Sequence, residues 1–402
     1  MLRKVLFTIV VMALALSLVV PVFAAGKHPG TPEEQTYKSN GFTDYEQLGK
    51  KLEKIEKNSK GLVEVEVVGE SNQGRDIYQA RIGNGDKVIL VQSEIHGNEK
   101  TGTEALLNIL QQLSSSQNAE VEEILEEVTL VMLPKMNPDA SELDRRGNDM
   151  SWDDVTKKFP QLEDAVPSWN HYHADGRAKL QGDDYTNRPG FDVNRDFNPN
   201  LDYTPMAEDF PGQSSEPGWY ITPEAQTVRD VYKSLLDEFG NVDVFIDLHH
   251  QGLYYVDDGS DDPVTLSLSG QFVPHPESEE GEKYNEYADK YDYDFSRQLN
   301  VAAYNELQQM GNSPFDNITL YRQGLDLPGT ALGSFALNGS GTVLFEVTGQ
   351  THSMGQKKKG MLVKGVETGL MGIIKGVASG AVYDLNPEDY EDIPLTKYPW
   401  EL

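Results

Sequence analysis

Cysteine is absent from this chain of 402 residues. The absence excludes disulfide bridges, a cysteine nucleophile and thiolate ligands for a metal. A chain of this length can bury a substantial core without such cross-links, as one large domain or two ordinary ones. Any zinc site in it must therefore use nitrogen and oxygen ligands.

Positive charge is also scarce. The chain has 34 Lys and Arg against 65 Asp and Glu, so its formal net charge is −31. A surface this acidic argues against nucleic acid or an anionic membrane as a partner. It is compatible with solubility in salty or alkaline surroundings and with attraction of cationic peptides, and charge alone does not separate the two.

Long apolar runs are confined to the N-terminus. Two basic residues precede the apolar run 5–20, and Val22-Phe23-Ala24 supplies a small-residue cleavage pattern. Residues 1–24 are therefore predicted to be a secretory signal peptide. A membrane anchor is the alternative, although Pro21 interrupts the run. No later segment is apolar and long enough to span a bilayer, so we expect a secreted protein that leaves the membrane after cleavage.

Apolar periodicity predicts strands that alternate with helices over most of the chain. The expected helices cover 45–57, 102–115, 119–126, 223–238, 294–310 and 358–377, and the expected strands cover 63–67, 77–82, 88–91, 128–133, 242–248 and 342–347. Thr43-Asp44-Tyr45-Glu46 predicts a capping box for the first helix. The alternation indicates an α/β fold: a single domain with a mixed, mostly parallel central sheet and helices on both faces.

The remaining segments have less regular composition. Residues 25–36 are polar and are expected to form a flexible lead, 37–378 the folded domain, and 379–402 a peripheral C-terminal tail. Residues 140–222 show little periodicity, and so long an irregular stretch within a compact domain is usually functional.

A histidine and a glutamate stand three residues apart where a predicted strand ends. His96 and Glu99 follow the apolar run 88–91, and a predicted helix begins just after them. Open α/β sheets bind ligands at this position. An imidazole nitrogen with a carboxylate oxygen suits zinc.

A second predicted strand, 242–248, runs out into His249 and His250. A lone histidine at a strand end is commonly only a polar end-cap, but two strand ends with histidine make that reading weaker. His249 is the preferred ligand. His250 should point to the opposite side. The alternatives are that it supports a ligand or, if the strand has curled, is the ligand itself. Two histidines and a carboxylate leave a fourth zinc position for water.

Two further groups are candidates for catalysis and binding. Glu346 lies inside an apolar strand, where an isolated carboxylate is costly unless its pKa shifts or it is paired, so it is a candidate general base; an inward salt bridge is the alternative. Asn194 and Arg195 lie in the irregular region between aromatic residues. A guanidinium can bind a carboxylate bidentately, although an exposed salt bridge would also account for Arg195.

The order of these motifs resembles that of the zinc carboxypeptidases of the carboxypeptidase A type. The resemblance spans about residues 37–378. It is carried by Gly69-Glu70-Ser71 with Gly74-Arg75, His96-x-x-Glu99, Asp192-Val193-Asn194-Arg195-Asp196-Phe197, Pro223-Glu224, His249, Tyr321 and Phe345-Glu346-Val347. Asn98 and Lys100 depart from the digestive branch, which has arginine and tryptophan there, so the chain is more similar to a bacterial secreted branch.

The resemblance implies a zinc carboxypeptidase-like catalytic domain that removes the C-terminal residue of peptides with a free C-terminus. It implies one zinc per chain, held by His96, Glu99 and His249. Glu346 would be the catalytic base. The arginine that polarises the scissile carbonyl would be Arg145 or Arg146, with Arg145 favoured here.

The resemblance also implies a binding site for the substrate's terminus. Asn194 and Arg195 would hold the terminal carboxylate, and Tyr321 would close over the bound residue. Asp326, within the expected pocket floor 323–335, is a candidate selector of basic terminal residues. We expect a monomer.

Two other functions remain open. One is an amidohydrolase of the same superfamily that acts on peptidoglycan stem peptides or small acyl-amino acids, and the other is a non-catalytic binding module, which should lack a ligand or base. The acidic stretch 257–291 is expected to be an insertion. Its Asp257, Asp258, Asp261 and Asp262 are candidate calcium ligands or part of a solvated loop.

Overall fold

The computed structural model describes residues 41–174, 183–260, 262–309, 317–349 and 355–398. The predicted signal peptide and flexible lead lie outside these ranges. Within them the chain forms an eight-stranded mixed sheet in the order β1-β2-β4-β3-β7-β11-β9-β10. Its strands are β1 (Val63–Glu70), β2 (Asp76–Ile82), β3 (Lys87–Ser93), β4 (Val128–Leu133), β7 (Val244–Gln251), β9 (Leu266–Ser269), β10 (Ile318–Leu320) and β11 (Gly341–Thr348).

The centre of the sheet is parallel and its flanks are mixed. β4, β3, β7 and β11 run parallel to one another. β1 and β2 pair antiparallel at one edge, while β9 is antiparallel to β11 and parallel to β10. The predicted fold class, a single α/β domain with a mixed sheet, is confirmed.

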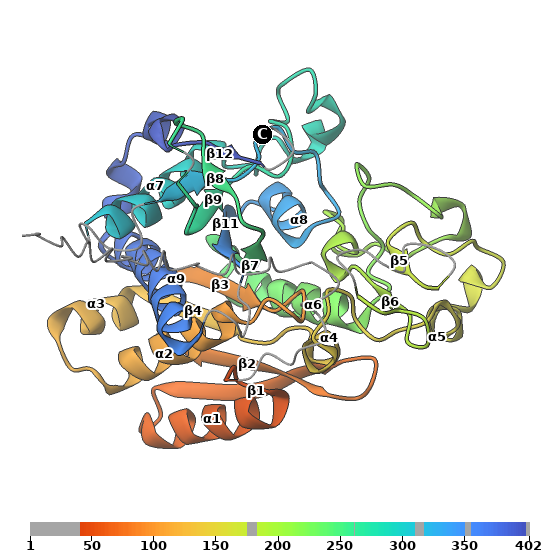
Figure 1. The fold of residues 1–402 in the computed structure, drawn as a ribbon, viewed down its shortest axis with the longest axis horizontal. Coiled ribbons are helices and arrows are strands. Elements are labelled where there is room, and N and C mark those ends of the chain that lie inside the picture. The colour runs from red at the N-terminus through yellow and green to blue at the C-terminus, as the bar shows by residue number, and fades with distance from the viewer. Residues whose placement is uncertain (1–40, 175–182, 261, 310–316, 350–354, 399–402) are drawn as a thin grey trace, which may run out of the picture.

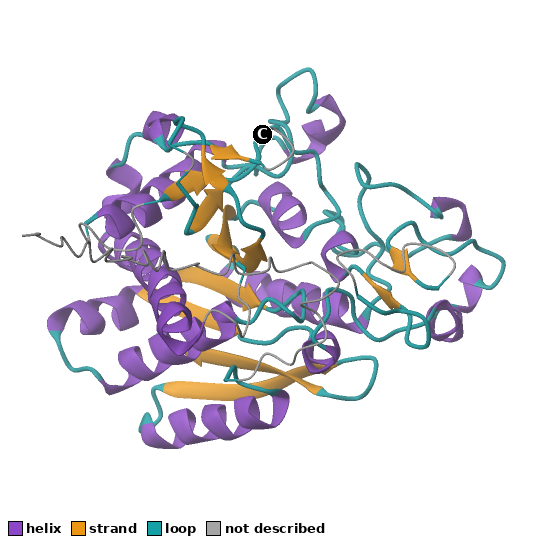
Figure 2. Cartoon of the chain, in the orientation of Figure 1, coloured by secondary structure: helices purple, strands orange, loops and turns teal. Residues whose placement is uncertain are grey.

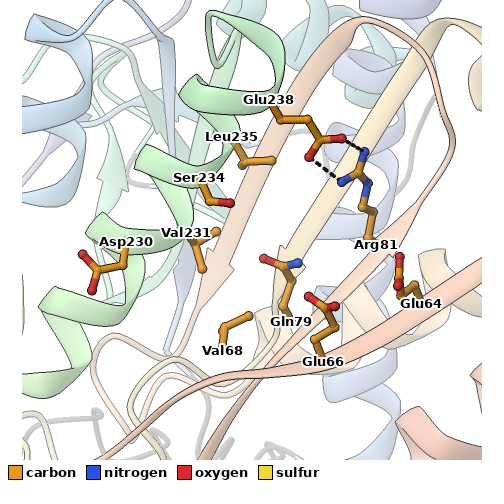
Figure 3. Close-up of a pocket in the computed structure, with 10 residues that line it drawn as sticks. All are labelled: Glu64, Glu66, Val68, Gln79, Arg81, Asp230, Val231, Ser234, Leu235 and Glu238. Carbon is orange, nitrogen blue, oxygen red and sulfur yellow. Dashed lines mark hydrogen bonds and ion pairs between the residues drawn. The ribbon is translucent and has the colours of Figure 1, made fainter.

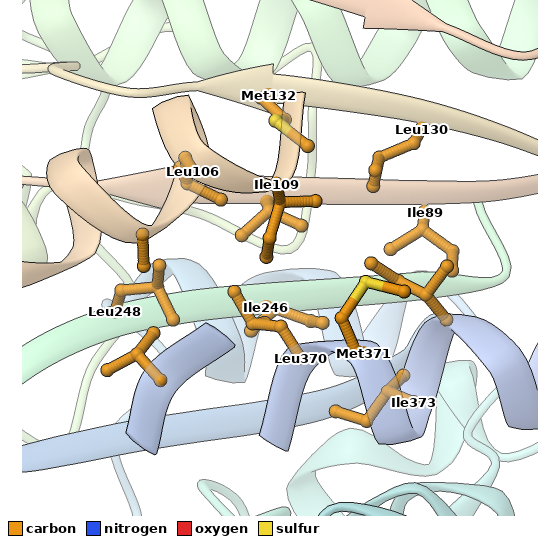
Figure 4. Packing of buried hydrophobic residues seen from close by; sticks show 14 of the residues in the cluster. Ile89, Leu106, Ile109, Leu130, Met132, Ile246, Leu248, Leu370, Met371 and Ile373 are labelled. Carbon is orange, nitrogen blue, oxygen red and sulfur yellow. The ribbon is translucent and has the colours of Figure 1, made fainter. Parts of the chain in front are cut away.

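Helices cover both faces of the sheet (Figure 1). One face packs against α1 (Tyr45–Asn58), α2 (Thr101–Ser115), α3 (Ala119–Glu127), α7 (Tyr293–Gln308) and α9 (Gly355–Ser379). Figure 4 shows this layer, where Ile89 and Ile246 of the sheet face Ile109 and Leu370 of the helices. The other face packs against α6 (Pro223–Phe239) and α8 (Ala331–Leu337). Because successive side chains of a strand alternate between faces, the buried parallel strands are apolar throughout.

Several boundaries differ from the prediction. The capping box of α1 lies one residue later than expected: Asp44 accepts from the Gln47 backbone, and the Gln47 side chain reaches back. β7 continues past residue 248 and includes both histidines. β9, β10 and α8 were not predicted, because each is short and lies between polar segments.

Residues 138–174 and 183–222 form an irregular lobe at one end of the sheet, which Figure 2 shows mostly as loop. It contains α4 (Pro138–Leu143), α5 (Trp152–Lys158), the two-residue strands β5 (His171–Tyr172) and β6 (Gly190–Phe191), and a small apolar core around Trp152 and Trp219. The tail returns to the β10 edge of the sheet, where Leu395 forms a bridge with Leu320 and β12 (Thr396–Lys397) pairs with β8 (Tyr255–Val256). No helix in the described ranges has the length and hydropathy needed to cross a bilayer.

Candidate metal centre

The carboxyl ends of three parallel strands bring the predicted site residues together. His249 of β7 is the register partner of Glu346 of β11. Both side chains lie on the α6 and α8 face, because Phe245 and Leu344, four and two residues earlier, pack there. His96 lies in the turn that follows the neighbouring strand β3. This is the edge of the sheet at which α/β folds bind ligands.

Three buried side chains place their donor atoms in one small cluster. Nδ1 of His96 lies 3.0 Å from Oε1 of Glu99 and 3.2 Å from Nδ1 of His249. Nδ1 of His249 lies 2.9 Å from Oε2 of Glu99. A tetrahedral zinc ion with ligand bonds of about 2.0–2.1 Å separates its ligand atoms by about 3.3 Å. The predicted ligands therefore fit zinc, and within the described residues no other group of three such side chains converges in this way.

The far nitrogen of each histidine faces a carboxylate. Nε2 of His96 lies 3.2 Å from Oδ1 of Asp192, and Nε2 of His249 lies 2.9 Å from Oδ2 of Asp247. Carboxylates in this position orient metal-binding imidazoles and raise their basicity. Sequence reasoning did not assign a role to Asp192 or Asp247. The available signal was that Asp247 stands two residues before His249 in a strand and so shares its face.

The ligand carboxylate is held in its charged form. Burial alone would raise the pKa of Glu99, but the charge of His96 and hydrogen bonds from His249 and His96 hold it well below its usual value. His250 does not join the cluster. Its Nε2 accepts from the backbone N–H of Thr101 at 3.1 Å, while its own backbone N–H donates to Glu99 at 3.1 Å.

Glu346 faces the same cavity as the ligand cluster. Its side chain is buried, and Oε2 has no hydrogen-bond partner among the described residues. Burial raises the pKa of Glu346 to about 8, with a further contribution from Glu99, while His249 and Arg146 act in the opposite direction. A buried carboxyl that has a raised pKa and lies beside a set of metal ligands can accept and return a proton near neutral pH.

The two adjacent arginines occupy different environments, and the preference for Arg145 is corrected. Arg145 is buried among backbone carbonyls, donating to Gly147 at 3.0 Å and to Arg188 at 2.6 Å. Its guanidinium also lies over the ring of Tyr185. Arg146, in contrast, lines the cavity, and its Nη1 lies 3.2 Å from Nδ1 of His96. The C-cap of α4, Asp144, stands directly before this pair in the left-handed conformation.

The predicted carboxylate clamp and tyrosine also line the cavity. Asn194 accepts from the backbone of Ala331 at 3.1 Å, and its Nδ2 lies 3.2 Å from Nε2 of His249. Arg195 donates to the carbonyl of Asn194 at 2.5 Å and is half-buried. Tyr321 follows β10, and its backbone N–H donates to the carbonyl of Leu268 at 2.7 Å. Of the predicted site residues, only Arg145 and the candidate selector Asp326 are not among those that line the cavity.

The cavity has a volume of about 300 Å³ and a mixed lining. The ligand cluster, Arg146, Arg195 and the exposed Arg322 are polar or charged. Five lining residues belong to or pack against one apolar cluster and are called the apolar wall: Phe272, Leu325, Leu327, Leu332 and Leu344. Asp326 is not part of it, because its carboxylate is bound by Lys283 Nζ at 2.7 Å and by the Tyr284 hydroxyl at 2.6 Å.

In the part of the chain that the structure describes, the other predicted or visible features form no second centre of this kind. Figure 3 shows a second cavity, between the β1–β2 hairpin and α6, in which Arg81 and Glu238 form an ion pair. Its volume is about 390 Å³, and four of its ten lining residues are acidic. Its lining contains no histidine. In the acidic stretch, Asp257, Asp258 and Asp262 are exposed, and Asp261 lies outside the described residues.

A sequence model of the zinc carboxypeptidase family matches residues 48–342, most of the chain. The chain belongs to this family. Zinc carboxypeptidases are peptide hydrolases that use zinc, so the predicted enzyme class and cofactor are confirmed, and the buried cluster of His96, Glu99 and His249 suits that metal. Glu346 lies just beyond the matched residues.

Solved structures show the same fold at low sequence identity. Thrombin activatable fibrinolysis inhibitor matches with a TM-score of 0.53 and 13% identity over 88% of this chain and 82% of that one. Its bovine form, solved with tick carboxypeptidase inhibitor, matches with a TM-score of 0.52 and 12% identity over 86% and 98%. Carboxypeptidase A from Helicoverpa armigera matches with a TM-score of 0.50 and 14% identity over 83% and 74%.

Proposed function

We propose that this zinc carboxypeptidase is a secreted enzyme that hydrolyses the C-terminal peptide bond of peptides with a free C-terminus and an apolar last residue. The observation that carries the proposal is the convergence on one cavity of the ligand cluster, the partnerless carboxyl oxygen of Glu346 and the guanidinium groups of Arg146 and Arg195.

Each of these groups has a distinct task. Bound zinc supplies Lewis-acid catalysis for the attack of water on a carbonyl. Glu346 accepts a proton from the attacking water as the water oxygen bonds to the carbonyl carbon, and then donates a proton to the leaving amine as the C–N bond breaks. Arg146 donates to the carbonyl oxygen as its negative charge develops. Arg195 binds the terminal carboxylate of the substrate, which fixes which bond reaches the metal.

The apolar wall determines the preferred last residue. Five apolar side chains line it, and burial of a substrate side chain there contributes roughly 25 cal/mol per Å². A basic side chain would find no carboxylate on that wall, because Asp326 is already bound to Lys283 and Tyr284. Secretion is supported by the apolar run 5–20 and the cleavage pattern that ends at Ala24.

The test is a set of N-blocked dipeptides that differ only in the last residue. We expect the highest kcat/KM with Leu or Phe, lower values with Lys or Glu, and loss of hydrolysis when the C-terminus is amidated. Chelation should remove zinc and activity together, and His96→Ala should not retain the metal. Activity only on amidated ends or on peptidoglycan stem peptides would instead favour the amidohydrolase alternative.

A further inference from the structure

The turn that carries His96 begins at a residue with an unusual backbone. Glu94 has a φ of 56°, in the left-handed region that side chains other than glycine rarely adopt. Its carboxylate is completely buried. A residue in this conformation persists only where its surroundings hold it, and such residues concentrate at functional sites.

A buried lysine holds the Glu94 side chain in place. Nζ of Lys135, just after β4, lies 2.6 Å from Oε2 of Glu94, and both side chains are 0% exposed. The same ammonium donates to Oγ of Ser141 at 2.6 Å. The hydroxyl of Thr103 in α2 donates to Oε1 of Glu94. Because desolvating two charges offsets most of their attraction, stability alone is a weak explanation for such a pair.

The segment that contains Lys135 contacts the metal-binding turn at three more points. The Asn137 side chain donates to the carbonyl of Ile95 at 2.9 Å. Gly97 packs so closely on α4 that an added Cβ would lie 1.9 Å from the carbonyl carbon of Ala140. Nζ of Lys100 pairs with Asp144 at 3.0 Å, directly at the end of α4.

The same segment also contains Arg146, the arginine that lines the cavity. It runs on through the left-handed cap Asp144 to Arg146, whose Nη1 reaches to 3.2 Å from Nδ1 of His96. The metal-binding turn and this guanidinium are thus both supported by the segment 135–146, and the Glu94–Lys135 pair is a completely buried charged contact between that segment and the turn.

We propose that the Glu94–Lys135 ion pair has a positioning role. It holds the left-handed turn before His96, and thereby fixes the position of the metal-binding Nδ1 of His96 relative to the guanidinium of Arg146. Neither residue lines the cavity, so both act through His96. The inference rests on the proposed function, but its main readout is zinc affinity, which is measured without substrate.

The experiment removes the pair without leaving a buried charge. Single variants such as Lys135→Met leave Glu94 uncompensated and are expected to lower the urea midpoint strongly. The double variant Glu94→Met/Lys135→Met removes both charges and leaves at position 94 a side chain for which a φ of 56° is unfavourable. We expect it to keep a midpoint close to that of the parent, to bind zinc about 10–100-fold more weakly, and to change the visible spectrum of the cobalt-substituted protein.

The control is the pair of Lys87 and Glu127, whose charged atoms are 3.0 Å apart and whose side chains are 25% and 48% exposed. Lys87→Met/Glu127→Gln should leave zinc affinity and the cobalt spectrum unchanged. If the Glu94→Met/Lys135→Met protein does not fold, Thr103→Val tests the same idea. It removes a hydroxyl that contacts both the Glu94 carboxylate and the carbonyl of Pro134, next to Lys135, and zinc affinity should again fall.

Parent-like zinc affinity and cobalt spectrum in the folded double variant, or in Thr103→Val if the double variant does not fold, would overturn the proposal. Failure of the proposed function would look different, as a parent protein that binds zinc tightly and cleaves no C-terminal residue.

Discussion

The carboxylate of Asp247 lies 2.9 Å from Nε2 of His249, on the side of the ring away from the ligand cluster. The contact is an ion pair that is not aligned as a hydrogen bond. Asp192 stands behind His96 in the same way, at 3.2 Å. Although burial disfavours the imidazolium, Asp247 holds the pKa of His249 well above its usual value. Protons therefore compete with a metal for this ligand, and zinc affinity should rise with pH.

We predict that Asp247→Asn weakens zinc binding about 10–100-fold, because the ring loses the charge that orients it and raises its basicity. Competition with a chromophoric chelator measures the affinity. Asp326→Asn is the control, since that carboxylate is bound outside the cavity. Equal zinc affinity in Asp247→Asn and the parent would contradict the assigned role.

The neighbours Arg145 and Arg146 should differ sharply when replaced. Arg146→Met is expected to retain zinc and fold but to lose about 10²–10³-fold in kcat, as for the loss of one donor to a developing oxyanion. Arg145→Met should instead destabilise the lobe by roughly 1–3 kcal/mol for each buried carbonyl left unpaired, with kcat little changed in the folded fraction. Urea unfolding and steady-state kinetics of both variants separate the outcomes, and the reverse pattern would restore the preference for Arg145.

The zinc ligands could be predicted from the sequence because strand-end position and side-chain alternation are local properties. His96 and His249 each follow an apolar run, and neighbouring parallel strands end at one edge of the sheet. The choice between Arg145 and Arg146 could not be made in the same way. It depends on the left-handed cap at Asp144 and on carbonyls from residues 147–189, which the sequence does not place in space.

Long-range contacts also explain the other errors. Asp326 looked like a free selector of charge, but Lys283 and Tyr284 bind it from a segment about 40 residues away. β9 reads Leu-Ser-Leu-Ser and lies in an acidic stretch, and it becomes a strand because β10 and β11 pair with it. Neither effect is visible in a short window of sequence.

Removing the side-chain charge of Glu346 should abolish proton transfer without removing the metal. We predict that Glu346→Gln keeps zinc affinity within about threefold while kcat falls about 10²–10⁴-fold, the usual contribution of a positioned base. Metal analysis and kinetics on a blocked dipeptide ending in Phe provide the two readouts. Substantial residual kcat would show that another group accepts the proton.

The C-terminal tail should affect substrate binding more than chemistry. The ring centroid of Tyr398 lies 4.8 Å from that of Tyr254 and 6.3 Å from that of Tyr321. Tyr254 and Tyr321 both line the cavity. Tyr398→Ala should therefore raise KM several-fold with kcat and zinc content nearly unchanged. Tyr383→Ala, at an exposed tail position on another face, is the control. An equal effect in both variants would indicate general loosening of the tail.

Glu224 gives the stability of the protein a specific pH dependence. It is buried at the start of α6 and accepts from the Asn148 side chain at 2.9 Å. Burial, with a contribution from the nearby Asp139, raises the pKa of Glu224 from 4.5 to about 7. The folded protein favours the protonated form of Glu224. The contribution of this group to the free energy of unfolding is therefore fully present below about pH 4.5 and is lost as the pH rises through about 7.

We therefore predict that Glu224→Gln becomes progressively more stable relative to the parent between pH 5 and pH 8, by on the order of 3 kcal/mol. Urea unfolding of both proteins at several pH values measures the difference. Glu238→Gln should show the opposite and smaller trend, because Arg81 lowers the pKa of that exposed carboxyl. A difference between parent and Glu224→Gln that does not vary with pH would mean that Glu224 is already ionised in the folded protein, held by its hydrogen bonds with Asn148 and the Asn72 backbone.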